Sequence, residues 1–264
     1  MSNPLRAPRF GLLEQLALGL VFLTCLPIRL RGALPDDAVA RAAWSFPIAG
    51  ALVGLAGAGA AIAADALGLP PLASALLALA ATMAMTGALH EDGLADTADG
   101  LGGGRTREQK LEIMKDSRIG SYGVLALIVG VGLRAVALGA LVEDTSLHLL
   151  GALVAAHAGS RALLPLLMRA LPPVRPGGLA ASVGVPSSLS SIAALVLGTA
   201  ATFWGLGDRL GLIGFVAAAV GMVAVGALAR RQLGGYTGDV LGAAQQVGEI
   251  VLLLAAVAQF PIPF

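Results

Sequence analysis

Charged residues are scarce in this chain. Only 12% of its 264 residues are Asp, Glu, Lys or Arg, whereas 57% are hydrophobic. A soluble globular protein has roughly 25% charged residues, so the shortage argues against a soluble domain and indicates a protein that lies in a lipid bilayer. The formal net charge of +1 comes without a basic stripe, which argues against a nucleic-acid partner.

Cysteine and several catalytic signatures are also missing. Cys25 is the single cysteine, so neither an internal disulfide nor a thiolate metal site can form. The chain has no Gly-x-Ser-x-Gly elbow, no Walker A loop and no His-Glu-x-x-His element. These absences argue against the corresponding serine hydrolases, nucleoside triphosphatases and zinc proteases.

Long apolar runs make up most of the sequence. Each is close to the ~20 residues that a helix needs to cross hydrocarbon. The seven runs are 44–67, 71–89, 122–141, 147–171, 189–206, 210–229 and 240–260. We therefore expect an all-α, polytopic integral membrane protein with about seven transmembrane helices. The runs leave no room for a separate soluble domain, so residues 1–264 are expected to form a single integral membrane catalytic domain.

The first apolar stretch, residues 10–27, differs from these runs. It contains Glu14, ends at a proline and is flanked by arginines on both sides. A spanning helix with positive charge at both ends conflicts with the positive-inside rule. We expect an N-terminal interfacial or re-entrant helix here, with a full span as the alternative.

Basic residues are distributed unevenly between the connections of the runs. With the first helix on the cytoplasmic side, the connections on that side hold fourteen of the seventeen Lys and Arg residues. The connections on the opposite side hold only Arg209. The positive-inside rule then predicts that the polar segment 90–122 faces the cytoplasm.

The most unusual polar segment, residues 90–100, directly follows an apolar run. It contains four of the sixteen acids within nine residues. Because each helical residue advances about 100°, Asp92, Asp96 and Asp99 share one helix face. Three carboxylates at a membrane edge suit a hard cation, most naturally Mg²⁺ with phosphates as its other ligands. The alternative is a polar loop that caps a helix end.

Basic residues follow this acidic face. The glycines at 102–104 can end the helix and let backbone N–H groups approach an anion. Arg105, Lys115 and Arg118 are candidate phosphate partners, although each could instead set topology or bind lipid headgroups. Phosphoryl transfer needs a metal site and anion-binding groups together, so residues 90–122 are the candidate active-site segment.

A second polar group lies at the start of the last apolar run. Asp239 and Glu249 follow helical spacing along one face of that run, and Thr237 or Asp239 could cap its helix. A cap explains one acid but not a second acid further into the membrane. Buried ionisable groups of this kind are candidates for function.

A third polar group lies inside the run 147–171. His157 and Arg161 share a helix face at positions i and i+4. A buried arginine needs a carboxylate or a phosphate, which Glu249, Asp239 or a substrate could supply. Arg175 follows in a proline-rich loop, where it could reach a substrate phosphate.

Several segments in a fixed order carry a family resemblance. The most specific is Glu-Asp-Gly-Leu-Ala-Asp-Thr-Ala-Asp-Gly at 91–100, followed by Met-Lys-Asp-Ser-Arg-Ile-Gly at 114–120. The others are 22–27, 46–50, 157–161 and 234–243. Together they resemble the adenosylcobinamide-GDP ribazoletransferase family, also called cobalamin synthase, over nearly the whole chain. His90 is a small departure from the residues usual in that family.

The resemblance implies an enzyme that joins α-ribazole, or its 5′-phosphate, to adenosylcobinamide-GDP. The products would be adenosylcobalamin, or its 5′-phosphate, and GMP. It also implies a location in the bacterial cytoplasmic (inner) membrane, with the site facing the cytoplasm. The chain could form a homo-oligomer or associate with other cobalamin-assembly enzymes.

This reaction suggests roles for individual residues. We expect Asp92, Asp96 and Asp99 to hold Mg²⁺, with Glu91 as an outer or additional ligand, and Asp116 or one of the cluster acids to accept the proton of the attacking hydroxyl. The expected catalytic residues are Asp92, Asp96, Asp99 and Asp116. The expected substrate-binding residues are Arg105, Lys115, Ser117, Arg118, His157, Arg161, Arg175, Thr237 and Asp239.

Two other functions are weighed against this one. A CDP-alcohol phosphotransferase is expected to show Asp-Gly-x-x-Ala-Arg, but Asp92-Gly93 is followed here by Leu-Ala-Asp-Thr, without the arginine. A cation-coupled transporter would use the ionisable groups inside the membrane as an ion path. Transporters tend to centre such groups near the midplane in repeated halves, whereas the densest acidic cluster here is at the membrane edge.

Overall fold

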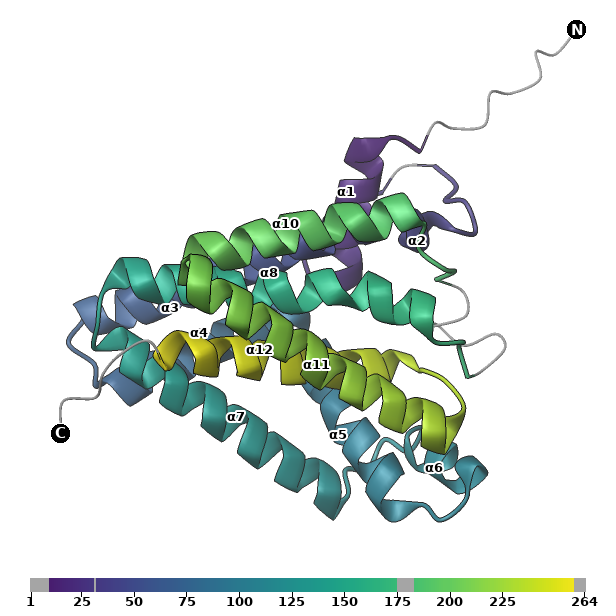
Figure 1. Ribbon diagram of the computed structural model, residues 1–264. Coiled ribbons are helices and arrows are strands. Elements are labelled where there is room, and N and C mark those ends of the chain that lie inside the picture. Colours follow the sequence, from purple (N-terminus) through teal and green to yellow (C-terminus); the bar gives the residue numbers. More distant parts are fainter. Residues whose placement is uncertain (1–9, 31, 175–182, 259–264) are drawn as a thin grey trace, which may run out of the picture.

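The computed structural model describes residues 10–30, 32–174 and 183–258, which form a bundle of helices (Figure 1). Within these ranges no strand occurs, apart from an isolated bridge between Pro173 and Tyr236. The all-α fold is therefore confirmed. The helices are α1 (Leu12–Leu23), α2 (Ala38–Ala42), the short 3-10 helix η1 (Ala43–Ser45), α3 (Phe46–Ala66), α4 (Pro71–Thr86), α5 (Leu89–Gly103), α6 (Arg107–Ile113), α7 (Ser121–Val142), α8 (Ser146–Ala170), α10 (Ser188–Leu206), α11 (Asp208–Leu233) and α12 (Gly238–Val257).

The number of candidate membrane spans agrees with the seven apolar runs. Six described spans are long and apolar enough to cross a membrane, or seven if the bent pair α4–α5 counts as one span. One of the six, Ala38–Ala66, joins α2, η1 and α3. Helix α1 has 12 residues. Its length of about 18 Å is well short of the ~30 Å hydrocarbon core, which fits an interfacial or re-entrant helix.

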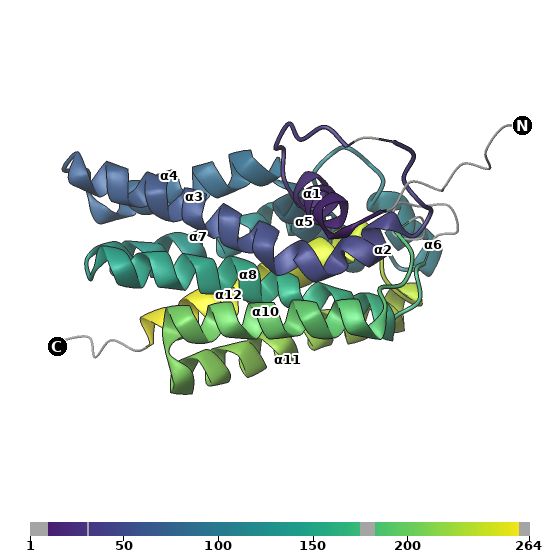
Figure 2. The same cartoon turned by 90° about the horizontal axis from the view of Figure 1, so that it is seen from above.

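Helix α8 lies at the centre of the bundle. It packs against α3, α10 and α12, and Figure 2 shows it between α3 and α10. In its most apolar 18-residue window 89% of the residues are buried, compared with 33% for α7, α10 and α11. The outer helices instead expose large aliphatic side chains, as expected where the surrounding solvent is hydrocarbon.

Glycines let the backbones of α3 and α8 approach closely. A Cβ atom on Gly54 would lie 2.5 Å from the carbonyl oxygen of Leu153, and one on Gly50 would overlap the carbonyl of His157. Small residues spaced four apart on one helix face allow such close packing in lipid. The sequence of the apolar run does not reveal which helix packs against Gly50 and Gly54, or how closely that helix approaches.

The run 71–89 does not continue as one straight helix. Helix α4 ends at Thr86, and the axis of α5 turns from it by 90°. Gly87 and Ala88 both adopt left-handed backbone conformations, with φ of 63° and 54°. Such a pair cannot continue a right-handed helix, so the chain bends there. The bend directs α5, with its acids, away from the direction of the long helices.

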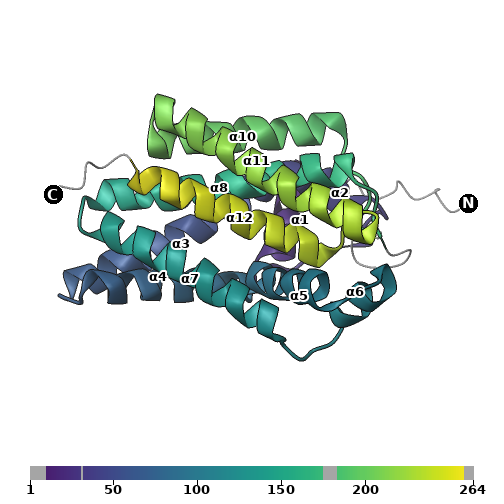
Figure 3. The same ribbon diagram turned by 60° about the horizontal axis from the view of Figure 1, so that its bottom comes forward.

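Helices α5 and α6 lie together at one end of the bundle (Figure 3). The glycine-rich segment ends α5 at Gly103, and α6 then begins with a capping box between Thr106 and Gln109. Arg107 donates from Nε to the carbonyl oxygen of Leu233 at 2.6 Å, which ties α6 to the end of α11. The candidate active-site segment is therefore attached to the bundle by α6.

The close approach of α3 and α8 predicts different effects on thermal stability for two alanine substitutions in α3. Gly54→Ala should lower the thermal stability in detergent, because overpacking against a backbone costs about 1–3 kcal/mol and exceeds the helix-propensity gain of alanine. Gly59→Ala is the matched control, since nothing lies within 4 Å of its added Cβ. Thermal unfolding followed by circular dichroism measures both. Equal melting temperatures for the two variants would refute this packing.

Candidate active site

The acids of α5 differ in exposure along the helix. Asp92 is exposed, Asp96 is half-buried and Asp99 is buried. The segment is helical from Leu89 to Gly103, so these acids have the helical register that the sequence predicts. The polar-loop alternative for this segment is therefore wrong.

Helix α12 crosses α5 beside these acids. A Cβ on Gly93 would lie 2.8 Å from the carbonyl oxygen of Asp239, and one on Gly242 would lie 3.3 Å from the Cα of Gly93. The absence of side chains at both glycines allows this crossing. It brings Asp239, which is far away in sequence, next to Asp92 and Asp96.

The carboxylates lie close enough to affect one another. The pKa of Asp96 is raised to about 6, first by its partial burial and then by the negative charges of Asp92, Asp239 and Asp99. Asp96 lies on α5, beyond the 90° bend at which the apolar helix α4 ends. Closely spaced carboxylates attract a cation, because bound positive charge removes their mutual repulsion.

Asp99 anchors the start of α7. Its two carboxylate oxygens accept hydrogen bonds from the backbone N–H groups of Gly120 at 2.7 Å and Gly123 at 2.8 Å. A side chain on either glycine would overlap the carboxylate. An acid at a helix N-terminus also interacts favourably with the helix dipole. This contact explains the burial of Asp99 without a metal ion.

Acids of α5 and the loop after α6 line a partly open cavity of about 470 Å³, which we call the polar cavity after these charged residues. Glu91, Asp92 and Asp96 line it from α5, and Lys115, Asp116 and Ser117 line it from the loop. The structure therefore brings together six residues that the sequence assigns to the site. Arg105 lies apart from them, in a neighbouring depression that also includes Lys115 and Asp116.

Asp116 and Arg118 form an exposed ion pair. The distance from Arg118 Nη2 to Asp116 Oδ2 is 2.7 Å. Hydrogen bonds from the Arg118 side chain and backbone lower the pKa of Asp116 to about 2. An acid with such a low pKa binds a proton weakly, so Asp116 is poorly suited to be the general base.

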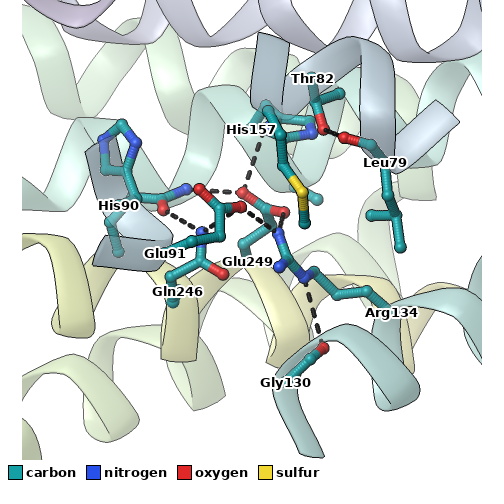
Figure 4. A network of polar contacts seen from close by, with 12 residues as sticks. Leu79, Thr82, His90, Glu91, Gly130, Arg134, His157, Gln246 and Glu249 are labelled. Carbon is teal, nitrogen blue, oxygen red and sulfur yellow. Dashed lines mark hydrogen bonds and ion pairs between the residues drawn. The ribbon is translucent and has the colours of Figure 1, made fainter. Parts of the chain in front are cut away.

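Glu91 points into the bundle, away from the exposed acids. Its Oε1 lies 2.8 Å from Nη1 of Arg134, and the same nitrogen lies 3.1 Å from Oε1 of Glu249 (Figure 4). Gln246 also donates to Glu91 at 3.3 Å. The arginine therefore joins α5, α7 and α12 in the interior. Glu91 is therefore engaged in the interior through Oε1, and it also lines the polar cavity together with its neighbour Asp92.

His157 and Arg161 belong to the same buried network, not to the polar cavity. Nδ1 of His157 lies 3.1 Å from Oε2 of Glu249, and Nη1 of Arg161 lies 4.0 Å from that oxygen. Arg161 also donates to the backbone oxygen of His157 at 3.1 Å. Glu249 is therefore the carboxylate that balances the charge of the buried Arg161. Within the part of the chain that the structure describes, Nε of Arg161 and Nε2 of His157 have no hydrogen-bond partner.

Thr237 and Asp239 form the start of α12. Thr237 accepts a hydrogen bond from the backbone N–H of Val240 at 3.3 Å, as a helix cap does. Its hydroxyl donates to Oδ2 of Asp239 at 3.1 Å. Thr237 therefore both caps the helix and orients the acid. Arg175 lies outside the described residues.

Arg134 is the residue that sequence reasoning left without a role. It lies inside the apolar run 122–141 and is 1% exposed. A charged residue at that depth signals a buried partner, but the sequence does not say which one. Only the fold brings Glu91 and Glu249, which are 158 residues apart in sequence, to the same guanidinium group.

The carboxylates near the polar cavity are candidate ligands for a metal ion. Among the described residues, no three His, Cys, Asp or Glu side chains converge as a metal site. Mg²⁺ usually takes one or two carboxylates together with water and substrate phosphates, so it does not require such a set. Asp92, Asp96 and Asp239 provide oxygen ligands of the right chemistry beside a polar cavity. Their donor set fits an ion that the substrate helps to hold.

The fold and the site define a multi-pass helical membrane protein with a carboxylate-rich cavity at one end of its bundle. Residues 15–257 match the family model for cobalamin-5-phosphate synthase. The chain belongs to this family. The assignment confirms the resemblance indicated by the sequence motifs.

Relatives named adenosylcobinamide-GDP ribazoletransferase align along almost their whole length. The Bradyrhizobium diazoefficiens protein is 51% identical over 248 residues, which are 94% of this chain and 95% of the relative. The Mesorhizobium japonicum protein is 47% identical over 265 residues, 97% of each chain. The Brucella canis protein is 42% identical over 256 residues, 94% of this chain and 98% of the relative. No solved structure matches the chain significantly.

The buried network predicts a large loss of stability when Arg134 is truncated. Arg134→Ala leaves Glu91 and Glu249 without their arginine, and breaking a buried ion pair costs about 3–5 kcal/mol. Arg209→Ala is the control, because Arg209 is exposed at the start of α11. Thermal unfolding in detergent measures both variants. Equal melting temperatures would show that the network does not hold the helices together.

Proposed function

We propose that this chain is the transferase that joins α-ribazole, or its 5′-phosphate, to adenosylcobinamide-GDP. The observation that carries the proposal is the family match over residues 15–257. Relatives of the same length, 42–51% identical, bear the name of that activity. The polar cavity with its acids and Lys115 supports it, because a diphosphate substrate requires cationic partners and charge neutralisation.

The reaction is a phosphoryl transfer between two substrates. A ribose hydroxyl oxygen of α-ribazole attacks the phosphorus that carries the cobinamide arm. A new phosphorus–oxygen bond forms, and the bond from that phosphorus to the bridging oxygen of the diphosphate breaks. GMP leaves with the electron pair of the broken bond, and the hydroxyl proton passes to a base.

Mg²⁺ would neutralise charge on the diphosphate and on the departing GMP. We assign Asp92, Asp96 and Asp239 to hold it, since these carboxylates are neighbours and two of them line the polar cavity. Glu91 and Asp99 are left out of this set. Oε1 of Glu91 is paired with Arg134, and both oxygens of Asp99 accept hydrogen bonds from the start of α7.

The other polar groups of the cavity position the substrates. Lys115 supplies a positive charge for a phosphate oxygen, and Ser117 a hydroxyl donor. One of the clustered acids on α5 accepts the hydroxyl proton, because Asp116 is held in its ion pair with Arg118. His157 and Arg161 act indirectly, because their contacts with Glu249 hold α8 against α12.

We further propose that this end of the bundle faces the cytoplasm of a bacterial cell. The basic residues of α6 and of the C-terminal end of α11 gather there, as the hydrogen bond from Arg107 to Leu233 indicates. The water-soluble substrate phosphates would then reach the polar cavity directly. Helix α5, which carries the exposed Asp92, lies at this same end of the bundle.

The transporter alternative has less support. The deep ionisable groups Arg134, Arg161 and Glu249 pair with one another, whereas an ion path would need accessible carboxylates. Purified protein in detergent separates the two functions, because no gradient exists there. An enzyme releases GMP under these conditions, and a transporter does not.

Replacing one of the clustered acids by its amide should strongly reduce the transferase activity. Asp96→Asn or Asp239→Asn should reduce kcat by a factor of about 100 or more, since each removes a charge aimed at the metal and the transition state. GMP release from adenosylcobinamide-GDP and α-ribazole in detergent, followed by chromatography, measures the effect.

The matched control for these variants is Asp65→Asn. Asp65 is an exposed acid near the end of α3, at the loop that leads to α4. It should retain wild-type turnover. Size-exclusion profiles and melting temperatures show that all three variants are folded. Wild-type turnover in folded Asp96→Asn would contradict the assigned role.

A further inference from the structure

A second cavity lies next to the acids and shares Asp92 with the polar cavity. Its volume is about 160 Å³, and most of its wall is apolar. Side chains and backbone from α1, α3, α5, α8 and α12 enclose it. We call it the apolar cavity, and the residues used below are Phe22, Phe46, Leu164, Met168, Asp92 and Asp239.

The wall of the apolar cavity suits a flat ring. Phe22 and Phe46 stack with centroids 5.8 Å apart and an angle of 12° between their planes. Phe46 is buried and supports Phe22, which is half-buried, and the pair presents aromatic surface to the cavity. Leu164 and Met168 add aliphatic and thioether surface from α8. A methionine adapts its shape to an aromatic ligand.

The polar part of this wall is confined to one region. Asp92, Asp239 and His90 line the apolar cavity near the crossing of α5 and α12. Asp92 also lines the polar cavity of about 470 Å³. A ligand seated in the apolar cavity would therefore present its polar end where a phosphate ligand of the polar cavity arrives.

The size of the apolar cavity limits its occupant. An engineered apolar cavity of about 150 Å³ in another protein holds a benzene molecule, so this one admits a small aromatic ring system. A corrin macrocycle is far larger. A guanine base carries several hydrogen-bond donors and acceptors, which these apolar walls would leave unpaired at a high energetic cost.

We propose that the apolar cavity binds the aromatic heterocyclic base of the nucleoside acceptor, with Phe22 and Phe46 as its contact residues. The ribose then lies at Asp92 and Asp239, so that its hydroxyl meets the diphosphate bound in the polar cavity. This inference rests on the proposed function, because the nucleoside is one of the two substrates of that reaction. The apolar cavity thus holds the base of the nucleoside, and the polar cavity holds the diphosphate of the other substrate.

The first test is kinetic. Phe46→Leu should raise the KM for α-ribazole about tenfold, the effect expected from losing one aromatic stacking contact. The KM for adenosylcobinamide-GDP should stay unchanged. Phe215→Leu is the matched control, because Phe215 is a buried phenylalanine on α11 that does not line the apolar cavity.

A second variant fills the cavity instead of enlarging it. Leu164→Phe should also raise the KM for α-ribazole, since the larger side chain occupies the space of the ring. Benzimidazole serves as a probe of the base alone. It should inhibit competitively against α-ribazole but not against adenosylcobinamide-GDP. A structural defect would change both KM values together.

Direct binding separates this inference from the proposed function. Calorimetry with α-ribazole alone should show binding to wild-type protein in detergent that Phe46→Leu and Leu164→Phe weaken and Phe215→Leu does not. Protein that shows this pattern but releases no GMP would refute the proposed function and leave the apolar cavity as the nucleoside site. Folded variants that release GMP with wild-type KM and affinity for α-ribazole would overturn the inference. Loss of co-purified lipid in those variants would identify an acyl chain as the occupant instead.

Discussion

The ion pairs of Arg134 with Glu91 and Glu249 are the constraint on which the arrangement of helices depends. A charged group inside an apolar bundle is tolerated only when an opposite charge and hydrogen bonds satisfy it. Arg134 meets both carboxylates at about hydrogen-bond distance, 2.8 and 3.1 Å. Glu249 in turn contacts His157 of α8. Four helices, α5, α7, α8 and α12, are therefore fixed to one another through one buried network.

This network also orients the acids of the site. Glu91 is held toward the interior, and the helical rotation to the next residue turns Asp92 outward. The close crossing of Gly93 and Gly242 then sets the distance to Asp239. The same short helix thus has one acid that holds the bundle together and others that face water. Its two functions follow from the position of each acid on the helix surface.

Much of the fold follows from the sequence alone. The length of the apolar runs predicts the membrane spans, and the short, doubly basic first run predicts a helix that does not span. The bend between α4 and α5 is not predicted, because Gly87 and Ala88 lie inside an apolar run with no proline or charge to mark it. Left-handed backbone at an alanine is unusual, and packing imposes it.

The candidate site is predictable only in part. The helical register of Asp92, Asp96 and Asp99 is readable from their spacing, and the isolated polar positions single out Asp239, His157 and Arg161. Which of them meet is a property of tertiary structure. The sequence could not separate Asp99, which caps α7, from Asp96, which faces the cavity. The pairing of Glu91 with Arg134, across 43 residues, likewise required the fold.

We propose that the acids at this end of the bundle support Mg²⁺-dependent transfer between the two substrates. Release of GMP by the purified wild-type protein in detergent tests this, with each substrate and Mg²⁺ omitted in turn. We expect one GMP for each cobalamin product, and none when either substrate or the metal is left out. Unchanged GMP release in excess chelator, or none with all components present, would contradict it.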